Sequence, residues 1–285
     1  MSISKSRLLK STLIGVSTLL LGTLIAYKLL APSQDGSVTQ SWSTSNNQST
    51  KVIDHQLWQA VLDDYLVFDE NLEINTFDYQ GLADDGTDSL DKYISYLSQL
   101  NPREFNSAEQ FAYWVNLYNA LTIQVVVRNY PVSSIKEIGS SPLPTGPWND
   151  EVVEITGEAL SLNHIEHSIL RPVWQDYRIH FAVNCASIGC PDLQEKAFTK
   201  NNTENLLNKA AQSFLTHERG LTLQNGTLTL SSIFDWYSED FGANKAEVLN
   251  TLSVHLPSKL AGQLKDYSGP VEYQYNWQLN EFNEP

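Results

Sequence analysis

The chain has 285 residues, of which 41% are hydrophobic and 18% are charged, a composition typical of a globular protein. Its formal net charge is −15, and the first 31 residues carry four basic and no acidic side chains, so the remainder carries −19. A domain this acidic lacks the clustered Lys and Arg that bind phosphate backbones, which excludes nucleic acid as a partner.

The first predicted element is a membrane helix. Three basic residues lie within residues 1–10, and a long uncharged stretch follows them. A helix over residues 11–31 would be about 30 Å long, which matches the hydrocarbon core of a bilayer. The segment around Tyr27 and Lys28 is a poor match to a cleavage site, which favours a retained anchor over a cleaved signal sequence. Because basic flanks stay in the cytoplasm, a single-pass membrane protein is expected, with its C-terminal domain extracytoplasmic or periplasmic.

The next segment is predicted to be a flexible linker. Residues 32–52 are rich in Ser, Thr, Gln and Asn, and Trp42 is their one large apolar residue. The remainder, residues 53–285, has a suitable size for one globular domain.

Apolar periodicity and turn signals predict the elements of this domain. Helices are expected over residues 54–65, 88–100, 107–128, 163–171, 203–217, 231–241 and 245–255, with strands over residues 152–155 and 180–184. A hairpin of residues 221–223 and 227–230 is expected around Asn225-Gly226. Helix outweighs strand, so the predicted fold class is α+β, a mostly helical single domain around a small antiparallel sheet.

The helix over residues 107–128 is predicted to be the central one, because it is apolar nearly all round. Ser107 and Gln110 have the spacing of a capping box. Asn116 and Asn119 share one face, and a buried amide needs partners. They could tie down loop backbone, or orient a substrate or a catalytic histidine.

The helix over residues 163–171 contains two histidines and one carboxylate. Glu166 stands three residues after Asn163, which is the spacing of a capping carboxylate. His164 and His167 share a face, but the usual metal-binding helix has its two histidines four residues apart. Packing or surface roles are therefore favoured over a metal site.

Both cysteines of the chain lie in residues 185–190, directly after the apolar run predicted as a buried strand. His180 belongs to that run. Cys185 could be a thiolate nucleophile with His180 as its base, and the turn could supply backbone N–H groups that lower its pKa and bind an oxyanion. A Cys185–Cys190 disulfide is the rival interpretation in an oxidising compartment, and a metal corner is the third.

An aromatic cluster occupies residues 234–241. Phe234, Tyr237 and Phe241 fall on one helical face and indicate core, whereas Asp240 is expected to point elsewhere. A groove for a sugar or peptide is the alternative.

Five segments in register resemble the bacterial and plant family known as domain of unknown function 547. They are FAYWVNLYNALT (111–122), IEHSILR (165–171), RIHFAVNCASIGCP (178–191), FDWYSEDF (234–241) and YNWQLN (275–280). The resemblance covers roughly residues 55–280, and Asn276 departs from the aspartate usual in the family. The family has no settled activity. Its motifs contain Asn116, Asn119, Glu166, His167, His180, Cys185 and Cys190, whereas His164 lies outside them.

A central helix with a histidine-bearing strand after it also looks like the papain and transglutaminase architecture, although this helix carries no cysteine. The leading hypothesis is a cysteine-dependent hydrolase or acyltransferase that needs no metal or cofactor and acts on a small-molecule or peptide-like ligand. The predicted roles are Cys185 as nucleophile, His180 or His167 as base, Glu166 to orient the base, Asn119 to position substrate or oxyanion, and Asn116, Trp236 and Tyr237 to position substrate. The alternative is a non-catalytic envelope binding or scaffolding module with a Cys185–Cys190 disulfide.

Overall fold

The computed structural model describes residues 34–282. The predicted cytoplasmic segment and the predicted membrane helix therefore lie outside the described residues. Within residues 34–282, no helix is both long and apolar enough to cross a bilayer. The chain from Gln34 onward forms one compact unit.

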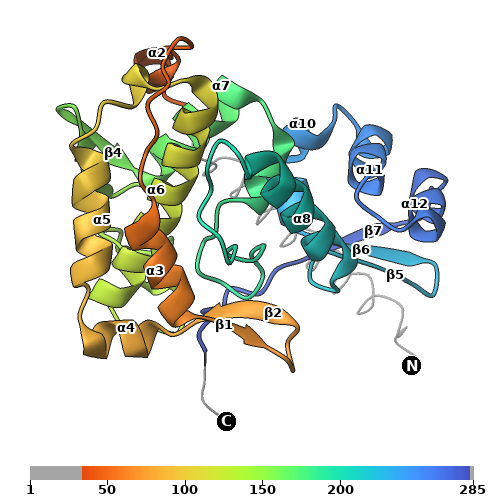
Figure 1. Ribbon diagram of the computed structural model, residues 1–285. Helices are drawn as coiled ribbons and strands as arrows, with labels where there is room; N and C mark the ends of the chain where they lie inside the picture. The colour runs from red at the N-terminus through yellow and green to blue at the C-terminus, as the bar shows by residue number, and fades with distance from the viewer. Residues whose placement is uncertain (1–33, 283–285) are drawn as a thin grey trace, which may run out of the picture. The chain divides into compact units, whose positions relative to one another are not determined.

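Helical residues far outnumber strand residues in this unit, which confirms the mostly helical α+β class (Figure 1). The elements are, in chain order, α2 (Gly36–Trp42), α3 (Gln56–Tyr65), β1 (Leu66–Asp69), β2 (Ile74–Phe77), α4 (Tyr79–Asp85), α5 (Asp88–Ser98), η1 (Pro102–Glu104), α6 (Ser107–Arg128), η2 (Ile135–Glu137), β3 (Glu151–Ile155), β4 (Glu158–Ser161), η3 (His164–Leu170), α7 (Arg171–Trp174), η4 (Tyr177–Phe181), α8 (Thr203–Thr216), β5 (Leu221–Gln224), β6 (Thr227–Ser231), α9 (Ile233–Trp236), α10 (Ser238–Phe241), α11 (Lys245–Ser253), α12 (Ser258–Lys265) and β7 (Val271–Gln274).

The strands of the described chain form three small sheets instead of the one predicted. β1–β2 and β3–β4 are antiparallel pairs, and the third sheet has the order β5–β6–β7 with β7 parallel to β6. The β5–β6 hairpin was predicted and is confirmed. Its turn residues Asn225 and Gly226 both have positive φ, 51° and 79°, as a type I′ turn requires.

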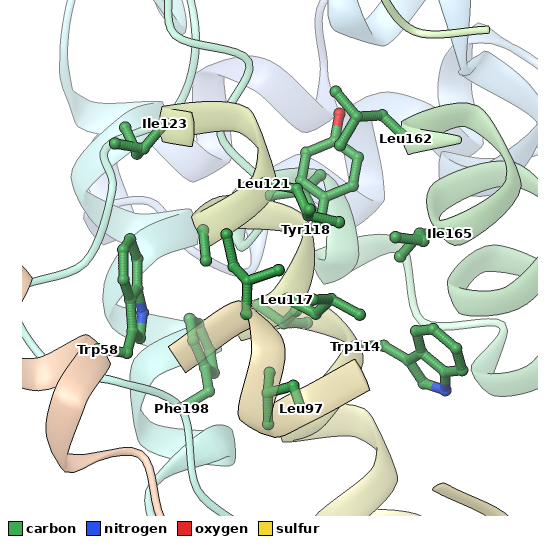
Figure 2. Close-up of a cluster of buried hydrophobic side chains, with 14 of the residues drawn as sticks. Trp58, Leu97, Trp114, Leu117, Tyr118, Leu121, Ile123, Leu162, Ile165 and Phe198 are labelled. Atoms are coloured by element: carbon green, nitrogen blue, oxygen red, sulfur yellow. The ribbon is translucent and has the colours of Figure 1, made fainter. Parts of the chain in front are cut away.

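Helix α6 is buried along most of its length, as its apolar pattern predicted. Figure 2 shows Trp114, Leu117 and Tyr118 of this helix among side chains from other elements, such as Trp58 and Phe198. Apolar side chains on every face of α6 are removed from water by the surrounding elements. The hydrophobic effect therefore holds those elements against α6. A second core lies among α8, the β5–β6 hairpin and the C-terminal helices.

The predicted capping box of α6 is wrong in its register. The N-cap is Asn106, whose side chain accepts a hydrogen bond from the Glu109 N–H, and not Ser107. Gln110 is buried, and its amide donates to the backbone carbonyls of Pro102 and Phe105. Polar side chains at this end of α6 thus join it to the preceding loop.

The predicted linker, residues 32–52, contains a packed helix. Its one large apolar residue, Trp42 of α2, is buried edge-to-face on Trp114, with ring centroids 5.1 Å apart. The backbone N–H of Asp35 donates to Ser168 Oγ at 2.8 Å. The segment therefore differs from a flexible tether, because one buried tryptophan is enough to hold a short polar helix on the domain.

The strand predicted over residues 180–184 is wrong. The structure has the 3₁₀ helix η4 there, followed by an irregular turn. Asp176 caps this helix by accepting from the Arg178 N–H. Residues 180–184 are all buried, and burial on every side makes a short helix and a buried strand look alike in sequence.

Two predicted helices differ in form from the expectation. The one over residues 163–171 is the π-helix η3, and α7 continues it to Trp174, because Pro172 lies in the first turn of α7 where no N–H is needed. The one over residues 231–241 is two short helices, α9 and α10, which meet at Tyr237. A π-helix inside a domain is often found at a functional site.

The two asparagines of α6 tie down loop backbone. Asn116 donates to the Phe198 carbonyl at 2.7 Å and accepts from the Phe198 N–H at 2.9 Å. Asn119 donates to the Ala182 carbonyl at 2.9 Å and accepts from the Asn184 N–H at 2.8 Å. Both side chains are buried, so their amides are used by the fold. The structure gives no support to the predicted substrate contacts of either residue.

Replacing Asn116 by Ala is expected to destabilise the fold. The change leaves the Phe198 N–H and C=O buried without partners, at about 1–3 kcal/mol each. We expect the free energy of unfolding in urea to fall by about 2–6 kcal/mol. The matched control is N250A, an exposed asparagine of α11, which should change it by less than about 0.5 kcal/mol. Equal stability of the two variants would contradict the assigned role.

Candidate functional site

A cluster of buried charged groups surrounds His180. Its Nε2 lies 2.6 Å from Oδ2 of Asp240 in α10, and its Nδ1 lies 3.7 Å from Oε1 of Glu166 in η3. The ring of Tyr237 stacks on the imidazole, with centroids 4.4 Å apart and planes at 13°. Asp240, expected to point elsewhere, is thus the hydrogen-bond partner that orients His180.

Arg171 joins this cluster from the end of η3. Its Nε donates to Asp240 Oδ2 at 2.6 Å, and its guanidinium lies over the ring of Tyr237. Burial works to raise the pKa of Asp240, but its hydrogen bonds with His180 and Arg171 outweigh burial and hold that pKa well below its usual range. Asp240 is therefore a carboxylate at neutral pH.

His167 is a neutral imidazole in this environment. Burial lowers its pKa to about 4, and the nearby Arg171 contributes in the same direction. Its Nδ1 lies 3.0 Å from Arg171 Nη1. Because a guanidinium can only donate, Nδ1 must accept, which leaves the proton on Nε2.

The spacing of Glu166 after Asn163 predicted a capping carboxylate. Glu166 does not cap its helix. Its carboxylate accepts a hydrogen bond from the Tyr118 hydroxyl at 3.0 Å and faces His180. Burial, followed by the charge of Glu166 and the sulfurs of Cys185 and Cys190, raises the pKa of Tyr118 well above its usual value. Tyr118 therefore stays protonated and donates to Glu166.

The two cysteines lie side by side as free thiols. Their Sγ atoms are 2.7 Å apart. Cys185 is half-buried, and its sulfur is 2.9 Å from the Tyr275 hydroxyl and 3.4 Å from that of Ser187. Burial works to raise the pKa of Cys185, but the hydrogen bonds with Cys190, Ser187 and Tyr275 outweigh it and bring that pKa below its usual value.

Cys190 has the opposite character. It is buried, and burial together with the neighbouring Cys185 raises its pKa well above the usual value. The Cys185 backbone N–H donates to the Cys190 sulfur at 2.9 Å. The pair thus contains one half-buried residue whose thiol has a lowered pKa and one buried residue whose thiol keeps its proton.

Asn184 shapes the turn that carries the cysteines. Its amide donates to the Pro191 carbonyl and accepts from the Ala186 N–H, both at 2.8 Å. The N–H groups of Ile188 and Gly189 donate to carbonyls of the C-terminal segment. These backbone donors are occupied, so they are not available as the predicted oxyanion site.

An aromatic surface adjoins Cys185. Trp236, Tyr275 and Trp277 are half-buried and in mutual contact, with ring centroids 4.6–5.7 Å apart. Tyr275 joins this surface to the cysteine sulfur through its hydroxyl. Of the two aromatic residues predicted to position substrate, Trp236 lies on this surface, whereas Tyr237 lies against His180.

The predicted direct pair of Cys185 and an imidazole is not formed. Among the hydrogen bonds of the described residues, those of His180 and His167 go to other groups, and none reaches Cys185. The Glu166 carboxylate acts to raise the pKa of Cys185, so its charge opposes the Cys185 thiolate.

In the described part of the chain, no group of three or more His, Cys, Asp or Glu side chains could hold a metal ion. His164 Nδ1 instead accepts from the Ser161 N–H.

Residues 102–215 match the family described as "Protein of unknown function, DUF547". The chain contains a DUF547 domain. No curated protein and no solved structure matches the chain. The DUF547 match includes both cysteines, His180, Glu166 and the two asparagines of α6. It is narrower than the predicted range of 55–280, and Asp240 and Tyr275 contact the DUF547 residues from outside it.

Sequence reasoning missed several residues of the site. Arg171, Asp240 and Tyr275 lie in the motif segments, but no spacing rule connects them with His180 or Cys185. Tyr118 looked like one more apolar residue of the central helix. Their roles depend on contacts between distant elements, which a local pattern does not contain.

The buried neutral His167 should make stability depend on pH. Its folded pKa of about 4 lies below the usual 6.5, so the unfolded chain binds more protons between these values. Stability is therefore expected to fall as pH decreases from 6.5 to 4, by at most about 1.4 kcal/mol per pH unit. H167Q keeps an acceptor for Arg171 and should flatten this dependence in urea titrations.

His55 has the same lowered pKa of about 4, caused by burial. The double variant H55Q/H167Q should therefore be flatter still. A full wild-type slope in H167Q would show that His167 is not held neutral.

Proposed function

We propose that the DUF547 domain is a cysteine-dependent acyl-transfer enzyme, a hydrolase or an acyltransferase, with Cys185 as the nucleophile. One observation carries this proposal: the half-buried sulfur of Cys185 is surrounded by Cys190, Ser187 and Tyr275, which favour its thiolate. A thiolate is the reactive form of cysteine in covalent catalysis.

In this scheme, hydroxyl donors replace the predicted proton transfer to His180. Burial and the cysteine sulfurs raise the pKa of Tyr275 well above its usual value, so its hydroxyl stays protonated and can donate. The thiolate adds to the acyl carbon, the leaving group departs with a proton, and water or a second acceptor then displaces the sulfur. As negative charge moves from the sulfur to the acyl oxygen, the Tyr275 hydroxyl is close enough to follow it.

The charged cluster supplies the proton for the leaving group in this proposal. His180 is oriented by Asp240, as a catalytic imidazole commonly is by a carboxylate. Glu166 faces this imidazole and accepts a hydrogen bond from the Tyr118 hydroxyl. A histidine, a carboxylate and a cysteine in neighbouring segments support the analogy with papain and transglutaminase, with the cysteine supplied by the turn instead of the helix.

The aromatic surface of Trp236, Tyr275 and Trp277 is proposed to bind the substrate beside the sulfur. Flat, partly apolar walls with a few polar groups are typical of sites for small molecules and peptides. The charge pattern of residues 1–31 supports a membrane anchor and an extracytoplasmic location for this activity.

A non-catalytic binding or scaffolding module is the second candidate. The observation in its favour is the 2.7 Å distance between the two sulfurs, which would suit a permanent disulfide.

The proposal predicts an unusually reactive Cys185 in the reduced protein. Iodoacetamide should label it with a half-maximal rate below pH 8.5, the pKa of a free cysteine. Y275F removes one hydroxyl donor and should move this midpoint upward. Y273F, an exposed tyrosine of β7, is the matched control and should leave it unchanged.

The same proteins test turnover of p-nitrophenyl acetate. C185S should lose any turnover, and C190S, whose hydroxyl can still donate to the Cys185 sulfur, should retain part of it. A reduced, folded protein whose Cys185 labels like a free cysteine, or whose turnover is equal in C185S, would contradict the proposed function.

A further inference from the structure

We infer that Cys185 and Cys190 form a reversible disulfide that switches the thiol site off. This inference deepens the proposed function and rests on it for the meaning of the switch, although the bond itself is argued from geometry alone.

The sulfur atoms are already close to bonding distance. Their separation of 2.7 Å compares with 2.03–2.05 Å in a disulfide, so an approach of about 0.7 Å completes the bond. Two unbonded sulfur atoms are normally well outside this separation. Side-chain rotation alone can therefore interconvert the two forms.

The turn is fixed by contacts that do not involve the sulfurs. Ile188 and Gly189 are bound through their N–H groups to the carbonyls of Gln278 and Asn276, both at 2.8 Å. A Cβ at Gly189 would lie 2.7 Å from the backbone nitrogen of Asn276, so only glycine permits this close approach. The backbone around the cysteines can remain in place in both redox forms.

Arg219 holds the far end of the same turn. Its Nη1 donates to the Cys190 carbonyl at 2.8 Å, and its Nη2 lies 2.7 Å from Asp192. Both ends of the turn are thus anchored to other parts of the domain. Because the stabilisation from a disulfide grows with the loop that it closes, a bond across residues 185–190 has little effect as a staple.

The two thiols differ in the way that exchange chemistry requires. Cys185 is half-buried and favours its thiolate, whereas Cys190 is buried and keeps its proton. An oxidant in solution therefore meets Cys185 first, and Cys190 resolves the intermediate. The oxidant is proposed to be a small-molecule disulfide, RSSR, of the kind present in an oxidising compartment.

The reaction has two balanced steps. The Cys185 thiolate attacks one sulfur of RSSR, the S–S bond of RSSR breaks, and RS⁻ leaves with the proton that Cys185 lost. Cys190 then loses its proton and attacks the Cys185 sulfur, which releases the second RSH. In total, two protein thiols are oxidised and one RSSR is reduced to two RSH. The reverse reaction with excess thiol regenerates the nucleophile.

The test incubates the full chain in buffers of reduced and oxidised glutathione, stops exchange with acid, then unfolds the protein, alkylates the remaining thiols with N-ethylmaleimide and measures the intact mass. The wild type should lose both alkylation sites in one step as the buffer becomes oxidising, and regain both on return to reduced glutathione without unfolding. C190S should instead accumulate a mixed disulfide with glutathione at Cys185. C185S should acquire no glutathione, because Cys190 is buried.

Three outcomes would overturn the inference. They are a wild type that keeps both thiols alkylatable in oxidised glutathione, a mixed disulfide equally abundant in wild type and C190S, and a disulfide that reduces only on unfolding. Circular dichroism of each variant controls for folding. The mass readout needs no substrate, so it tests the disulfide independently of the proposed function. If the disulfide is reversible but the reduced Cys185 is unreactive, the proposed function is contradicted and the inference of a redox pair still holds.

Discussion

The position of the cysteine turn depends on one buried amide. Asn119 of α6 binds the backbone on both sides of residue 183, through the Ala182 carbonyl and the Asn184 N–H. Asn184 in turn binds Ala186 and Pro191 across the turn. A rigid buried helix therefore fixes the turn through two successive asparagine side chains. Such a network is stable only when each member is satisfied, which restricts the conformations open to Cys185.

The charged cluster has a similar logic. Burying the charges of Asp240 and Arg171 and the polar ring of His180 is costly unless each group has a partner, and the hydrogen bonds among them supply those partners. The groups come from η4, α10 and α7, so the cluster also joins the two hydrophobic cores of the domain. The chemistry of the site and the cohesion of the fold thus depend on the same contacts.

The parts of the fold that sequence predicts well are those with a local cause. The central helix followed from its apolar pattern, and the β5–β6 hairpin followed from Asn225-Gly226. The strand predicted around His180 failed because burial on all sides removes the periodicity that separates helix from strand. The prediction of a flexible linker did not anticipate the packing of Trp42. A single aromatic side chain is too small a signal to predict that a short helix packs on the domain.

The sequence predicted which residue types form the candidate site better than it predicted the contacts between them. Both cysteines, His180 and Glu166 were identified, but the partners that orient them, Asp240 and Tyr275, come from segments far along the chain. For Asn119, both a tie to loop backbone and a role in positioning substrate were open, and its partners are the Ala182 carbonyl and the Asn184 N–H. A buried amide can serve either purpose, and only the identity of its partners decides between them.

The docking of α2 has a mechanical consequence. The first tertiary hydrogen bond of the described chain joins Asp35 to Ser168, in the middle of η3. The Thr39 hydroxyl adds a second bond to the Ser168 carbonyl at 2.7 Å. A pulling force applied to the N-terminal side of the domain would therefore act first on η3, the helix that carries Glu166 and His167. Such a force would reach the charged cluster before the rest of the domain.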